Sequence, residues 1–159
     1  FYFYLHFYTV NTAKLSENVW KEAEKMLEQI QKYPQKEEYQ KLVEEDRINL
    51  YEREAEKGDD RKFLEETDRV FKENLRGDSA WKLYERKLVY LESKQPDISR
   101  EFERFLKKYP KVMDAYVEYS IYLCRNNKMT QAQRVYREGR KQTGMTSKRA
   151  EELRRKLGL

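Results

Sequence analysis

Apolar residues recur along this chain at intervals of three and four residues, the spacing that gathers them on one face of an α-helix. In the first such stretch the apolar face includes Val19, Ala23 and Leu27, with Ser16 as a candidate N-cap and Pro34 beyond the end. No segment alternates apolar and polar residues for long enough to indicate a β-strand. The pattern therefore predicts an all-α protein.

Glycines, prolines and a pair of asparagines interrupt this periodicity and predict where the helices end. A capping box of Thr130 and Gln133 is expected to open a late helix, Asp97 an earlier one, and Asp78 or Ser79 the helix that contains the second tryptophan. We expect helices that end at or near Tyr33, Gly58, Gly77, Pro96, Pro110, Asn126 and Gly144, before a final helix that Thr146 or Ser147 begins.

A helical hairpin recurs in the second half of the chain. Its first copy has helices that contain residues 80–85 and 100–106, and its second copy has helices that contain residues 115–119 and 134–138. Trp81 and Tyr116, the equivalent aromatic residues, are 35 residues apart. A period of this size is typical of stacked helix pairs and is not typical of a closed enzyme fold.

The same pairing extends over the whole chain and predicts an α-α superhelix, or solenoid, that is right-handed. It would contain about four antiparallel helix pairs, followed by a C-terminal helix that closes the stack: residues 1–34, 36–76, 79–109 and 112–143. The second pair fits this register least well. We expect one repeat domain over residues 1–159, as a fragment of a longer repeat array.

The aromatic opening segment, residues 1–10, is interpreted through the same repeat. Aligning the helix after Ser16 with the helix after Thr130 places Tyr2 on Tyr116, which predicts the end of a helix and not a strand. Four apolar residues would then share one face and pack on the helix that contains Trp20: Phe1, Tyr4, Leu5 and Tyr8. The segment has no basic lead-in and no cleavage site, so it does not resemble a signal peptide.

Two local motifs accompany the period. The first helix of a pair carries an aromatic residue three positions before a tyrosine, at Trp81/Tyr84 and Tyr116/Tyr119. The second helix carries an arginine two positions before an aromatic residue, at Arg100/Phe102, Arg69/Phe71 and Arg134/Tyr136. Residues 102–106, followed by Pro110, closely resemble the second helix of a HAT (half-a-TPR) repeat. The likeness is good over 79–143 and weaker over 36–76, and the small residues Ala115, Ala132 and Gly139 leave a TPR-like interpretation open.

The resemblance implies a non-enzymatic scaffold that binds other proteins within an RNA-processing assembly, such as splicing, 3′-end processing or rRNA maturation. It also implies a nuclear location, and it leaves a homodimer open because several HAT proteins dimerise. A single cysteine, which excludes an internal disulfide, fits an intracellular protein that is not secreted. No apolar run reaches the length of a membrane span.

Stacking of helix pairs requires large residues at the seams between helices, and the aromatic residues of the motifs supply them. The predicted seam residues are Trp81, Tyr84, Phe102, Phe105, Tyr116, Tyr119 and Tyr136. Charged residues make up 40% of the chain and mean hydropathy is −1.13, values that would suggest disorder if aromatic residues were scarce. The thirteen tyrosines, seven phenylalanines and two tryptophans instead favour helices that each bury only a stripe.

Positive charge is concentrated near the end of the chain. Residues 134–156 hold nine basic and three acidic side chains, a local excess larger than the +5 net charge of the whole chain. Arg134, Arg137 and Lys141 share one helical face, with Arg154 and Arg155 as further candidates, and such a surface can bind an acidic protein or RNA phosphates. A solvated polar face on a terminal repeat explains the same pattern equally well.

No arrangement of residues in the sequence points to catalysis, a metal or a cofactor. His6 is the only histidine, and Cys124 has no activating base near it in the sequence. The carboxylates at 44–46 and 59–60 have structural reasons to lie on a helix face and at a helix N-terminus, and the acidic stretch 37–56 is interpreted as a solvent face. An enzyme is therefore the weakest hypothesis. A pentatricopeptide-like binder of single-stranded RNA over 113–147 is the main alternative to a protein scaffold, although the small polar base-reading residues it requires are not found.

Overall fold

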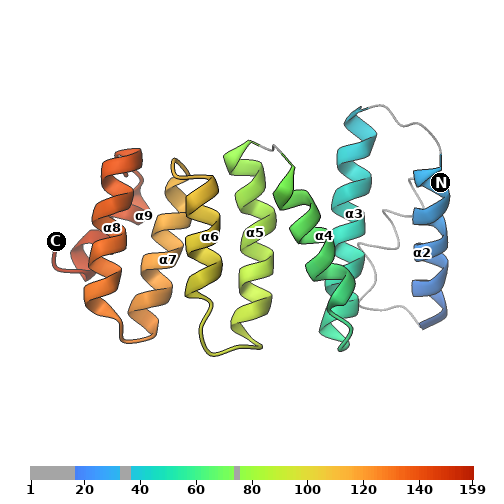
Figure 1. Ribbon diagram of the computed structural model, residues 1–159, viewed down its shortest axis with the longest axis horizontal. Helices are drawn as coiled ribbons and strands as arrows, with labels where there is room; N and C mark the ends of the chain where they lie inside the picture. Colours follow the sequence, from blue (N-terminus) through green and yellow to red (C-terminus); the bar gives the residue numbers. More distant parts are fainter. Residues whose placement is uncertain (1–16, 33–36, 74–75) are drawn as a thin grey trace. The chain divides into compact units, whose positions relative to one another are not determined.

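The computed structural model describes residues 17–32, 37–73 and 76–159, and within these ranges the chain forms helices and no strand (Figure 1). The all-α prediction is confirmed for the described residues. The helices are α2 (Glu17–Gln31), α3 (Glu37–Glu56), α4 (Arg61–Lys72), α5 (Gly77–Glu92), α6 (Ser99–Lys108), α7 (Met113–Arg125), α8 (Met129–Thr143) and α9 (Lys148–Lys156). The opening segment 1–10 and its predicted packing lie outside the described residues, as does the side chain of Trp20.

Several predicted helix ends agree with the structure. Gly144 follows α8 in the left-handed conformation, with φ of 80°, where a residue without a side chain avoids a steric penalty. Ser147 caps α9, because its hydroxyl accepts a hydrogen bond from the backbone N–H of Ala150 at 3.2 Å.

Two predicted helix boundaries are wrong. Gly77 begins α5 and does not end the preceding helix, and a Cβ atom at this position would lie 2.7 Å from Cγ2 of Val112. Close approach of the two segments therefore explains the glycine better than helix termination does. The capping box of Thr130 and Gln133 does not form, since Gln133 donates its amide hydrogen bond to the carbonyl of Leu157 at 2.8 Å.

Two compact units make up the chain, residues 1–69 and residues 70–159. In the N-terminal unit α2 packs against α3 around a small apolar core of Ala23, Leu27, Ile30, Val43 and Leu50. Charged side chains join α4 to this unit: Arg47 of α3 lies 2.9 Å from Glu66. Lys62 contacts both Glu24 and Glu54.

The acidic stretch of α3 is only partly the solvent face that its composition predicted. Asp46 is 2% exposed, and Glu44 pairs with Arg69 at 3.3 Å. At least these two carboxylates of α3 are therefore directed into their own unit and not into solvent.

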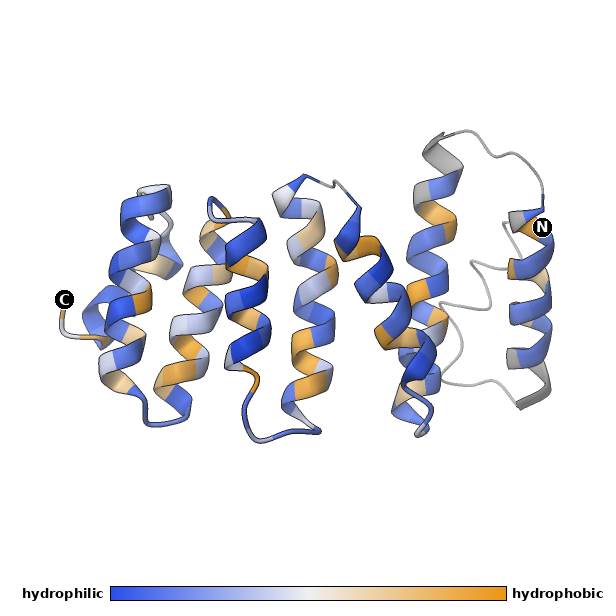
Figure 2. Ribbon diagram, in the orientation of Figure 1, coloured by the Kyte–Doolittle hydropathy of each residue, from blue (hydrophilic) through white to orange (hydrophobic). Residues whose placement is uncertain are grey.

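The C-terminal unit holds α5 to α9, whose consecutive helices run in opposite directions and lie side by side from α5 to α8 (Figure 1). The helix α7 is central, because α6, α8 and α9 all pack on it. Figure 2 shows apolar residues as short bands on helices that are otherwise polar. The outer helices thus bury one stripe and expose charge elsewhere, as the composition predicted, whereas the central helix α7 is buried on most of its sides.

Burial in this unit repeats with the sequence period. The first helices bury residues at spacings of three and four: Trp81, Tyr84 and Leu88 in α5, Tyr116, Tyr119 and Leu123 in α7, and Ala150, Leu153 and Leu157 at α9. The second helices bury residues at spacings of four and three: Ile98, Phe102 and Phe105 at α6, and Ala132, Tyr136 and Gly139 in α8. The helix α9 therefore has the buried pattern of a first helix.

Candidate binding groove and basic face

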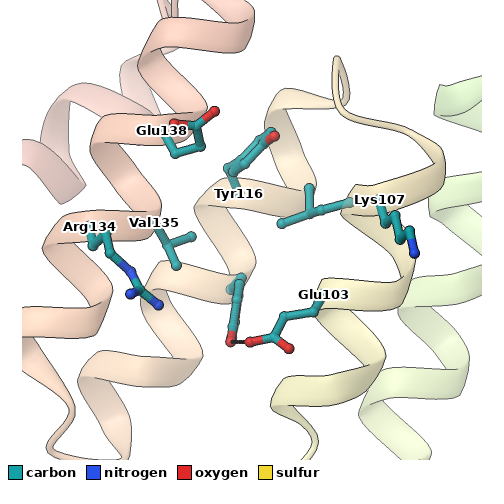
Figure 3. Close-up of a pocket in the computed structure, with 8 residues that line it drawn as sticks. Glu103, Lys107, Tyr116, Arg134, Val135 and Glu138 are labelled. Atoms are coloured by element: carbon teal, nitrogen blue, oxygen red, sulfur yellow. Dashed lines mark hydrogen bonds between the residues drawn. The ribbon is translucent and has the colours of Figure 1, made fainter.

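An open groove of about 430 Å³ lies between α6 and α8, with α7 beneath it (Figure 3). Its walls are Leu106 of α6 and Val135 of α8, and its floor is formed by Tyr116 and Tyr119 of α7. Four charged residues stand at its rim: Glu103 and Lys107 on α6, and Arg134 and Glu138 on α8. We call this feature the α6–α8 groove.

The floor of the groove is held by the seam beneath it. The Tyr119 ring stacks on Phe102, with ring centroids 4.8 Å apart and planes 9° from parallel. The hydroxyl of Tyr119 donates a hydrogen bond to Glu103 at 3.2 Å. Burial raises the pKa of Tyr119 to about 12, and the neighbouring Glu103 carboxylate adds to the rise, so the phenol stays protonated. The floor is therefore a fixed, neutral surface.

The charges at the rim differ in how far they are already satisfied. Glu103 accepts the hydrogen bond from Tyr119, and Glu138 accepts one from Gln142 at 2.6 Å. Lys107 and Arg134, in contrast, make no ion pair or hydrogen bond with any residue that the structure describes. The hydrogen bonds to the two acids come from neutral groups, so the rim itself carries two acids and two bases, and the excess of positive charge lies beyond it, along the exposed side of α8.

The predicted binding residues fall into two groups. Arg134, Arg137 and Lys141 are exposed on one side of α8 and form no ion pair with the described part of the chain; we call them the basic face of α8. Only Arg134 also lines the groove. Arg154 and Arg155 lie on α9, where Arg154 bonds Glu151 at 2.9 Å and Arg155 is exposed. The structure thus brings three of the five together on α8.

All seven predicted seam residues are at most 6% exposed. Between α5 and α6, the ring centroid of Phe105 lies 5.1 Å from those of both Trp81 and Tyr84. Phe102 joins this pair to the next through Tyr119. These aromatic residues position α6, α7 and α8 and so determine the shape of the groove.

Sequence reasoning missed a buried cluster of charged side chains between α5 and α6. Lys87, which is 4% exposed, lies 3.0 Å from Glu101, and the hydroxyl of Tyr84 donates to the same carboxylate at 2.6 Å. Burial opposes ionisation of Glu101, but these two donors outweigh it and hold the pKa of the carboxyl below its ordinary value. The available signal was Lys87 itself, a charged residue within the apolar stripe of α5.

A second surface lies on α5, α7 and α9, away from the groove lining. Glu118 of α7 forms an ion pair with Arg149 of α9. Burial, Glu118 and Asp114 all raise the pKa of Glu85, while Arg149 opposes them. Val89 is 65% exposed beside these carboxylates, in a small hollow that Glu85 and Glu118 also line. The acids here are partly compensated by Arg149, so this surface has less unpaired charge than the basic face of α8.

Two findings concern a metal site and an activated cysteine in the part of the chain that the structure describes. Within it, no group of three or more histidine, cysteine or acidic side chains is placed to hold a metal ion. Burial raises the pKa of the Cys124 thiol, the opposite of what an activated nucleophile requires. His6 lies outside the described residues.

No described helix has both the length and the apolar character that crossing a membrane requires. Comparison of the chain with models of protein families, with curated proteins and with solved structures finds no match.

Proposed function

We propose that this chain is a non-enzymatic helical-repeat scaffold, similar to HAT and TPR-like proteins, that binds protein partners within an RNA-processing assembly in the nucleus. In this proposal the helix pairs form a right-handed superhelix, and α9 closes the stack. Several proteins of this class dimerise, so self-association belongs to the proposal as one mode of partner binding.

The observation that supports the proposal most is the recurrence of burial with the sequence period. Residues at the same positions of α5 and α7, and again of α6 and α8, are buried with the same spacing. Repeats of this kind contact mainly their neighbours and leave long faces open, which suits the binding of macromolecules better than the enclosure of a small substrate. The proposed contact surface is the basic face of α8, with Arg154 and Arg155 as secondary contacts.

The test is affinity capture from nuclear extract with the purified chain as bait, with and without ribonuclease treatment. A scaffold that binds proteins directly retains the same enriched partners after the ribonuclease step. Loss of every enriched protein after ribonuclease treatment, or enrichment of none above an unrelated helical bait, would contradict the proposal.

A second candidate function is binding of single-stranded RNA, and the unpaired cations of α8 favour it. Phosphate contacts make such binding fall steeply with salt. Anisotropy of a labelled 20-nucleotide single-stranded RNA, measured at about 50 and 200 mM salt, separates the two functions. Tight binding that falls by orders of magnitude between these conditions would favour the RNA binder. Absence of binding at the lower salt would favour the protein scaffold.

A further inference from the structure

We propose that the α6–α8 groove receives one large apolar side chain from an acidic peptide segment of a partner protein, and that the basic face of α8 binds the carboxylates next to that side chain. This inference rests on the proposed scaffold function and adds the chemistry of the segment that is bound. Its support comes from the lining of the groove, from its unpaired charges and from the way its aromatic rings are covered.

The lining favours an apolar anchor. A volume of about 430 Å³ falls within the range of roughly 300–1,000 Å³ that is usual for ligand sites. Leu106 of α6 and Val135 of α8 (Figure 3) both line the groove and are only half-buried, so apolar surface on each wall is still in contact with water. One aromatic or leucine side chain between them would remove that surface from water, which is how anchor residues contribute most at interfaces.

The charges favour an acidic sequence around the anchor. The acids at the rim, Glu103 and Glu138, already accept hydrogen bonds from within the chain. The cations Lys107 and Arg134 have no partner among the described residues, and Arg137 continues the unpaired charge along α8. Inside the rim the two acids balance the two bases, but an acidic segment that extends from the groove along α8 would meet Arg134, Arg137 and Lys141 against the single carboxylate of Glu138.

The aromatic floor favours a peptide over RNA. Proteins that bind single strands through stacking present open ring faces to the bases. Tyr116 and Tyr119 are only 5% and 6% exposed, and one face of Tyr119 is covered by Phe102. The floor therefore leaves little open ring surface on which a base could stack.

The test begins with selection of binders to the full chain from a displayed library of random 12-residue peptides. We expect the selected peptides to share one aromatic or leucine residue flanked by aspartate or glutamate. Affinities of a selected peptide are then measured by fluorescence anisotropy for Val135→Trp, which fills the groove without changing charge, and for Val89→Trp as the matched control. Val89 is exposed on α5 and does not line the groove. We expect at least tenfold weaker binding for Val135→Trp and unchanged binding for Val89→Trp.

A charge pair of variants completes the design. Arg134→Glu should weaken the same peptide at least tenfold, with a smaller loss at higher salt, whereas Lys82→Glu, an exposed reversal on α5, should leave it within twofold. Selection of peptides without acidic residues, or equal binding by the Val135→Trp and Val89→Trp variants, would overturn the inference. The inference would also be overturned if single-stranded RNA displaced the peptide and if binding of that RNA were weakened by Val135→Trp.

Folding of the groove-filling variant is checked by its circular dichroism melting curve. If it does not fold, methyl NMR shifts of the wild-type chain titrated with the peptide decide the question: shifts at Leu106 and Val135 support the groove, and shifts confined to other methyl groups contradict it. If partner capture from extract persists in Val135→Trp but is lost when the basic face is reversed, the scaffold function stands and the groove inference alone fails.

Discussion

Replacing Phe102 with alanine should destabilise the C-terminal unit by roughly 4–5 kcal/mol. Phe102 is 4% exposed and connects two helix pairs, since its ring lies 6.5 Å from Trp81, 4.8 Å from Tyr119 and 5.5 Å from Tyr122 between centroids. Loss of the buried ring costs roughly 2–3 kcal/mol. A residual cavity of about 80 Å³ adds about 2 kcal/mol, at about 24 cal/mol per Å³.

The assay is urea denaturation followed by fluorescence of Trp81 in a Trp20→Phe background, so that the only tryptophan reports on the C-terminal unit. The chain has two tryptophans, and Trp81 belongs to the same aromatic cluster as Phe102. Val89→Ala, at a residue that is 65% exposed, is the control and should change stability by less than about 0.5 kcal/mol. A loss below about 1 kcal/mol for Phe102→Ala would refute the proposed seam and with it the repeat register.

Three further substitutions test other features of the unit. Gly139→Ala should destabilise the unit, because the new Cβ would lie 2.6 Å from Cβ of Tyr116 and overpacking costs roughly 1–3 kcal/mol. This loss exceeds the gain of about 1 kcal/mol that alanine brings to a helix. A thermal melting point above that of wild type would contradict this prediction. Glu101→Gln should flatten the acid side of the stability curve. The pKa of Glu101 in the folded protein lies below its ordinary value of 4.5. The ionised carboxylate therefore contributes its full stabilisation above pH 4.5, and this stabilisation is lost as the pH falls through the folded pKa. If the free energies of unfolding in urea change in parallel for wild type and Glu101→Gln between about pH 3 and 6, the role given to Glu101 is wrong. Tyr136→Phe removes the buried hydrogen bond from the tyrosine hydroxyl to the carbonyl of Ala150, which is 3.0 Å long. We expect the free energy of unfolding to fall by about 1 kcal/mol and amide hydrogen exchange in α9 to become faster. Unchanged exchange in α9 would argue against that contact.

The helical fold could be predicted because it depends on local periodicity. The spacing of Trp81, Tyr84 and Leu88, repeated 35 residues later, specifies both a helix and the side of it that is buried. Helix starts were less predictable, since they depend on contacts from distant segments. Gly77 was interpreted as a helix end, whereas its closeness to Val112 explains it.

Parts of the site could not be predicted for a similar reason. The basic face of α8 follows from one helix alone, because residues three and four apart share a side. The groove requires Leu106 and Val135, from helices that both pack on α7, to face each other across it, and no local pattern indicates this. The ion pair of Lys87 with Glu101 likewise joins two helices. The sequence alone therefore showed only that Lys87 lies among the apolar residues of its helix.

The central claim is that this chain is a scaffold whose partners bind the basic face of α8. Its most direct test replaces Arg134, Arg137 and Lys141 with glutamate and measures the captured partners by quantitative mass spectrometry. The control carries the same number of reversals at exposed residues outside α8: Lys82, Arg100 and Lys111. We expect ribonuclease-resistant partners to be depleted at least tenfold with the α8 variant and retained with the control, and the depletion to shrink as salt rises. Equal recovery of every partner with both variants would show that the basic face is a solvated surface and would contradict the account.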